Sequence, residues 1–93
     1  MAVRVYVATY LRPFTGGKSE ITLPGSPATV AEALEALAAL HRGVRERIFT
    51  EQGEVRPHVN LFVGEENIRD ARGLETPVPD GSEISILPAV SGG

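Results

Sequence analysis

The stretch TVAEALEALAALHRG (residues 29–43) carries the strongest secondary-structure signal in the chain and decides its fold. Apolar residues recur there at intervals of three and four, which predicts an amphipathic helix with one apolar face. Its exposed positions are mostly Glu and Ala, which favour helix. The residues predicted to face the core are Val30, Leu34, Leu37 and then Leu40 or His41.

Both ends of this helix carry signals of their own. Thr29 and Glu32 stand three residues apart at its start, so each side chain can accept a hydrogen bond from the other residue's free backbone N–H. Gly43 is predicted to close the helix in the left-handed conformation that glycine adopts easily. A further short turn is expected after it, anchored to the core by Ile48 and Phe49.

Alternating segments precede the helix. Residues 3–11, VRVYVATYL, begin with a period of two, which is typical of a half-buried strand. The inward set is Val3, Val5 and Val7, and the outward set is Arg4, Tyr6 and Ala8. Residues 19–23, SEITL, alternate again, and the Pro and Gly-Gly between the two segments predict a β-hairpin with a long loop.

Further strands follow the helix. Residues 58–64, HVNLFVG, predict a strand with Val59, Leu61 and Val63 inward and with His58, Asn60 and Phe62 outward. A short strand is expected around Ile68. The last strand, EISILPAV (83–90), has Ile84 and Ile86 inward and Ser85 and Leu87 outward. Pairing is expected to weaken at Pro88, because proline has no backbone N–H to donate.

This order of elements predicts an α+β fold, in which a mixed sheet of about four to five strands packs on one main helix. If the first and last strands are central neighbours, they run parallel, with the helix in their right-handed connection. Residues 1–87 are expected to form the domain and residues 88–93 a flexible C-terminal tail.

Composition excludes several kinds of function. The chain has 93 residues, a formal net charge of −3 and no run of Lys or Arg, so we expect no nucleic-acid partner. It has no cysteine, and its histidines, His41 and His58, lack metal-ligand spacing, so we predict no metal site. The sequence shows no Ser-His-Asp arrangement, so we predict no catalytic residues. No signal peptide or bilayer-spanning segment is evident, which predicts a cytoplasmic protein without a membrane partner.

Two features indicate that other proteins bind this chain. Tyr6, Phe62 and Leu87 fall on the outward faces of three strands, and together they would form an exposed apolar patch of the kind that docks a partner. The sequence also ends in Gly-Gly, and six extended tail residues would reach at most roughly 20 Å into a partner's narrow cleft. The residues expected to enter that cleft are Pro88, Val90, Ser91 and Gly92, followed by the terminal carboxylate of Gly93.

Two segments, LRPFTGGK (11–18) and ILPAVSGG (86–93), give the chain a resemblance to a known family. With the predicted strand–helix order, it resembles the prokaryotic sulfur carrier proteins, which have the ubiquitin-like β-grasp fold. That family includes the small subunit of molybdopterin synthase and the thiamine sulfur carrier. The chain looks most like the carrier of cysteine biosynthesis.

The resemblance implies a cycle that is centred on Gly93. An E1-like enzyme would use ATP to adenylate this residue, and a sulfur donor would convert the adenylate to a thiocarboxylate. The sulfur would then pass to an acceptor, which in cysteine biosynthesis is an activated serine in a pyridoxal-phosphate enzyme. A metalloprotease would release the product. The chain itself would hold no cofactor, and it would be a co-substrate of these enzymes and not an enzyme itself.

Alternative functions remain open at this point. The chain could be the small subunit of molybdopterin synthase, bound to the large subunit, or a carrier for thiamine synthesis or tRNA thiolation. It could instead be a ubiquitin-like modifier, joined through Gly93 to lysines of other proteins. A fourth possibility is a binding module whose Gly-Gly end has no role.

Overall fold

A computed structural model describes residues 2–89 of the chain. The expectations for Val90, Ser91, Gly92 and Gly93 therefore lie outside the described residues. The strands are β1 (Arg4–Val7), β2 (Glu20–Thr22), β3 (Val59–Val63), β4 (Glu66–Asn67) and β5 (Glu83–Pro88). The α-helices are α1 (Val30–Leu40) and α2 (Gly43–Ile48), and the 3-10 helices are η1 (Thr9–Phe14), η2 (Ile68–Asp70) and η3 (Gly73–Glu75).

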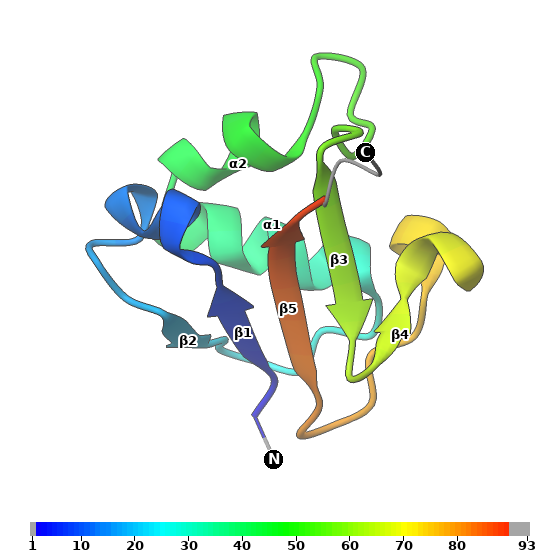
Figure 1. Ribbon diagram of the computed structural model, residues 1–93. Coiled ribbons are helices and arrows are strands. Elements are labelled where there is room, and N and C mark those ends of the chain that lie inside the picture. Colours follow the sequence, from blue (N-terminus) through cyan, green and yellow to red (C-terminus); the bar gives the residue numbers. More distant parts are fainter. Residues whose placement is uncertain (1, 90–93) are drawn as a thin grey trace.

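The five strands form one mixed sheet in the order β2-β1-β5-β3-β4. The central strands β1 and β5 are parallel, and every other neighbouring pair is antiparallel. Parallel neighbours need a long crossover connection, and here that connection contains α1. Figure 1 shows α1 lying behind the sheet, with the opposite face of the sheet towards the viewer. The prediction of an α+β fold with central parallel first and last strands is confirmed.

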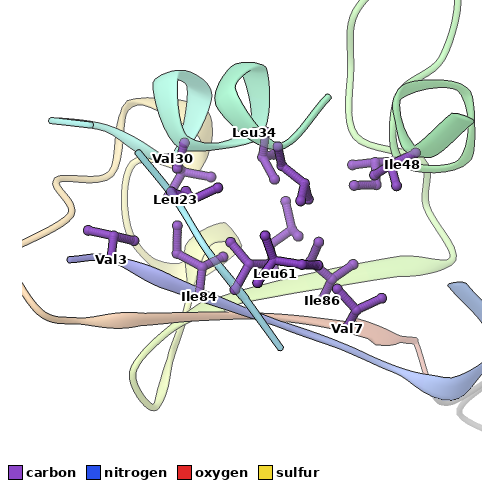
Figure 2. Packing of buried hydrophobic residues seen from close by; sticks show 14 of the residues in the cluster. Val3, Val7, Leu23, Val30, Leu34, Ile48, Leu61, Ile84 and Ile86 are labelled. Atoms are coloured by element: carbon purple, nitrogen blue, oxygen red, sulfur yellow. The ribbon is translucent and has the colours of Figure 1, made fainter. Parts of the chain in front are cut away.

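The core lies between the sheet and α1, with Ile48 of α2 at one end (Figure 2). Val5 of β1 and Ile84 and Ile86 of β5 are completely buried, as the period of two predicted. From the helix side, the same core receives Val30, Leu34 and Leu37. Burial of this apolar surface is the main force that holds helix and sheet together. Within residues 2–89, no helix is long and apolar enough to cross a membrane.

The two ends of α1 depart from the sequence prediction in detail. Thr29 Oγ1 accepts a hydrogen bond from the Glu32 N–H at 3.3 Å, as predicted, but Glu32 Oε1 accepts from the Ala28 N–H at 3.0 Å rather than from Thr29. Leu40, which was a candidate for the core, is 50% exposed, because it falls outside the face that contacts the sheet. The predicted start of the helix is therefore correct, and one of the two predicted capping hydrogen bonds is present.

The prediction that Gly43 closes the helix in a left-handed conformation is wrong. The helix cap is His41, and Gly43 instead begins α2 and is not among the glycines of positive φ. A side-chain carbon at Gly43 would lie 3.2 Å from Cδ1 of Phe14, which is closer than most such contacts. The absence of a side chain at Gly43 thus leaves room for the Phe14 ring, a contact that only the tertiary structure reveals.

The first strand is shorter than its sequence suggested. It ends at Val7, and the chain turns into η1, where Leu11 is completely buried. Ala8, which was expected to point outward, is 8% exposed, because the turn carries it out of the strand alternation. The antiparallel pairing of β1 with β2 across this long connection confirms the predicted hairpin.

Candidate functional site

The face of the sheet opposite α1 brings the three predicted docking residues together. Tyr6 on β1 and Phe62 on β3 are both paired with Ser85 of β5, so they stand on either side of it. Leu87 lies two residues further along β5, on the same face, opposite Asn60 of β3. All three apolar side chains are partly exposed. We call these three residues, Tyr6, Phe62 and Leu87, the apolar patch; its role in docking stays a prediction.

One flank of the apolar patch is positively charged, which the sequence analysis did not anticipate. Arg12 of η1 folds back over Tyr6, with its Cζ 5.9 Å from the ring centroid and its Nη2 donating to the tyrosine hydroxyl at 3.2 Å. The same side chain donates from Nε to the Val7 carbonyl at 3.1 Å, at the end of β1. The guanidinium is thus fixed beside the patch, where it can meet a carboxylate of a partner.

The opposite end of the same face is acidic. A side-chain hydrogen bond with Glu20, followed by partial burial and the nearby Glu20 charge, raises the pKa of Glu83 above its ordinary value of 4.5. Arg4, which is paired with Glu83 on the neighbouring strand, opposes this shift. The open face therefore carries opposite charges at its two ends, with the apolar patch between them.

The root of the C-terminal segment is fixed more firmly than expected. Pro88 pairs with Val59, and the Ala89 N–H donates to the His58 carbonyl at 2.8 Å. The prediction that pairing weakens at Pro88 is wrong. Alternate residues of β5 form backbone hydrogen bonds to β3, and the residues between them face β1. Because Ala89 bonds to β3, the Pro88 nitrogen faces β1, where the chain has already turned into η1. The missing N–H is therefore not needed.

Three further arginines lie close to this root. Arg69 donates from Nη2 to the carbonyls of Val59 at 2.8 Å and of Arg56 at 3.2 Å. Arg56 donates from Nε to the Glu46 carbonyl at 2.9 Å. Arg47 stacks its guanidinium 4.4 Å from the ring centroid of Phe14. These contacts come from segments that are distant in sequence, and no local pattern marked them.

The histidine and acidic side chains of residues 2–89 do not form a metal-binding cluster. Across residues 2–89, no three His, Cys, Asp or Glu side chains gather as a metal site would require. His41 caps α1, and His58 lies at the start of β3 beside Ala89, so the two histidines have separate surroundings. The apolar patch and the root of the C-terminal segment are thus the features with a possible function.

Comparison with known proteins gives consistent matches along the chain. The family described as the ThiS family matches residues 5–93. The sulfur carrier protein CysO of Mycobacterium tuberculosis is 37% identical over 95 aligned residues, covering 100% of both chains. Small archaeal modifier protein 3 of Haloferax volcanii is 35% identical, covering 95% of this chain and 94% of that protein. Among solved structures, a chain of the Amycolatopsis orientalis BexX/CysO complex matches with a TM-score of 0.87 and 38% identity, covering 99% of this chain and 100% of that one.

Proposed function

The chain belongs to the ThiS family of ubiquitin-like sulfur carriers, with their β-grasp fold, and from this we propose that Gly93 carries sulfur as a C-terminal thiocarboxylate. The observation that supports this most strongly is the match to CysO over the full length of both proteins. In this proposal the chain is a co-substrate, and partner enzymes supply the catalysis.

The chemistry requires two steps at the carboxylate of Gly93. Carboxylate is a poor acyl donor, so its oxygen first attacks the α-phosphorus of ATP and displaces pyrophosphate, which yields an acyl-adenylate. A sulfide equivalent then attacks the carbonyl carbon and displaces AMP, which leaves the thiocarboxylate. An E1-like enzyme is the proposed partner for adenylation, and ATP binds to that enzyme rather than to this chain.

The paired root at Ala89 shortens the reach expected of the tail. Four residues, 90–93, follow it, and a fully extended segment of that length spans at most about 14 Å. The sequence predicted a free tail of six residues, 88–93, with a reach of roughly 20 Å. The adenylation site of the partner should therefore lie within this distance of the surface against which the end of β5 docks, and Val90, Ser91 and Gly92 should line the path to it.

Cysteine biosynthesis is the pathway that we propose, because the Mycobacterium tuberculosis relative is a CysO protein. The sulfur acceptor would then be an activated serine held by a pyridoxal-phosphate enzyme, and a metalloprotease would release the cysteine afterwards. The apolar patch is proposed to dock the carrier on these partners. In the alternative pathway, the enzyme that holds the sulfur acceptor would be the large subunit of molybdopterin synthase.

Intact mass spectrometry tests the proposal. The chain is incubated with ATP, a sulfide source and extract of its host, and the expected result is a mass gain equal to replacement of one oxygen by sulfur, localised to Gly93. A variant with one alanine added after Gly93 serves as the matched control and should fold normally but gain no sulfur. Sulfur gain by the extended variant, with the added residue still present, would contradict the proposal.

A second candidate is protein modification through an isopeptide bond from Gly93. It is favoured by the similarity to small archaeal modifier protein 3 over most of both chains. The same incubation distinguishes the two functions, because modification gives conjugates of higher mass, in which the carboxyl carbon of Gly93 is joined to lysine. Conjugates without any thiocarboxylate would favour the modifier.

A further inference from the structure

Four arginines gather around the end of β5, at the point from which residues 90–93 continue. They come from η1, α2, the loop before β3, and η2, so the fold rather than the sequence assembles them. We call them the arginine cluster, and its members are Arg12, Arg47, Arg56 and Arg69. The chain as a whole has a net charge of −3, so this concentration of positive charge runs against its overall balance.

Shared neighbours connect the members of the arginine cluster. Arg47 stacks on Phe14, which belongs to the same short helix as Arg12. Arg47 and Arg56 also line one shallow pocket, together with Glu46 and His58. Arg69 in turn donates a hydrogen bond to the Arg56 carbonyl.

This series surrounds the root of the tail. His58 is the residue whose carbonyl accepts the hydrogen bond from the Ala89 N–H. Arg69 donates to the side-chain oxygen of Asn60, which lies opposite Leu87 of β5. The positive charges therefore border the place where the C-terminal segment leaves the sheet.

The guanidinium groups of the cluster are held in place without a carboxylate partner among residues 2–89. Backbone carbonyls anchor Arg12, Arg56 and Arg69, and an aromatic ring supports Arg47. The ion pair found among residues 2–89 is elsewhere, between Arg45 and Glu35. Glu46 lines the same pocket as Arg47 and Arg56, but its carboxylate is not within ion-pair distance of either.

We propose that the arginine cluster docks against carboxylate side chains on the rim of the cleft in the enzyme that adenylates Gly93. This inference rests on the proposed function. A guanidinium fixed by a carbonyl still offers further N–H donors, and it binds carboxylates through paired hydrogen bonds. Because the cluster borders the tail, such contacts would orient the chain as the glycines enter the cleft, and the opposite charges would speed the encounter.

The test measures ATP–pyrophosphate exchange by the purified adenylating enzyme of the host, with the full chain as the varied substrate. The test variant combines Arg47→Gln and Arg56→Gln. A second variant, with Arg47→Lys and Arg56→Lys, keeps both charges. Arg72→Gln is the matched control, since Arg72 is exposed and caps η3, which packs beside α1. Thermal unfolding of each variant checks that the fold is intact.

The Gln variant should lower kcat/KM for the carrier about tenfold at about 50 mM salt, through a higher KM with kcat nearly unchanged. The loss should shrink to about twofold at about 500 mM salt, because exposed charges are then screened. The Lys variant keeps the charges but loses the paired hydrogen bonds, so its kcat/KM should lie between those of the Gln variant and the wild type. Arg72→Gln should stay within about threefold of the wild type.

Other outcomes would overturn the inference. If the Gln variant has the same kcat/KM as an active wild type, or if salt does not change its loss of kcat/KM, the arginines do not dock on carboxylates of the enzyme. If the Gln variant raises the KM for ATP and not the KM for the carrier, the arginines bind the phosphates of the nucleotide instead. A wild-type chain that supports no exchange, with an enzyme shown to be active on another carrier, would overturn the proposed function and the docking role together.

Discussion

Single alanine substitutions of two neighbouring residues on β3 should have different effects, one mainly on stability and the other mainly on partner binding. Leu61 is 1% exposed and lies in the core, whereas Phe62 is partly exposed on the opposite face of the sheet. Leu61→Ala removes buried methyl groups and leaves a cavity, which should lower the free energy of unfolding by about 3 kcal/mol. For a domain of this size, that corresponds to a fall in Tm of about 15 °C.

Phe62→Ala should have the reverse pattern. It loses partial packing against its strand neighbours, which is worth about 1 kcal/mol, or a fall in Tm of about 5 °C. An aromatic side chain at the centre of an interface is worth about 2 kcal/mol of binding, so kcat/KM in pyrophosphate exchange should fall about thirtyfold. Leu61→Ala, assayed below its Tm, should keep nearly wild-type exchange.

Circular dichroism during heating and pyrophosphate exchange provide the two measurements. The reasoning fails if Phe62→Ala lowers the Tm as far as Leu61→Ala, since Phe62 would then belong to the core. It also fails if Phe62→Ala leaves exchange unchanged, because the apolar patch would then have no part in docking.

Two further predictions concern stability. Thr29→Ala removes the acceptor for the Glu32 N–H and should lower the free energy of unfolding, measured in urea, by about 1 kcal/mol. Thr29→Ser keeps a hydroxyl acceptor and should keep the wild-type free energy of unfolding. Equal free energies of unfolding for the two variants would contradict a stabilising role of this hydrogen bond. The folded-state pKa of Glu83 is raised, so this carboxyl group adds to the free energy of unfolding when it is protonated. That added stability is fully present below pH 4.5 and is lost as the pH rises through the raised pKa. Glu20→Gln should therefore raise the urea midpoint at about pH 7 but not at about pH 4, and an equal change at both would contradict the carboxyl pair.

The sequence by itself determined the main helix, the longer strands and most of their buried faces. The short strand expected around Ile68 is wrong in position, because β4 ends at Asn67 and Ile68 begins η2. A period of two put Val5 and Ile86 in the core, and spacing of three and four did the same for Leu34. These patterns are local, because the geometry of a strand or helix alone decides which side chains share a face. The resemblance carried by the Gly-Gly end and the hairpin likewise indicated the family from sequence alone.

The tertiary structure alone decided how the ends of these elements meet. Gly43 resembled a helix cap in the sequence, but it begins α2 and packs closely against the ring of Phe14, which is distant in the sequence. Pro88 resembled a strand breaker, but its nitrogen faces a side from which β1 has already departed. No pattern in the sequence indicated the arginine cluster, because its four arginines belong to separate segments that only the folded chain brings to the end of β5. Local patterns report which face is buried, whereas the choice of neighbour depends on the packing of the whole chain.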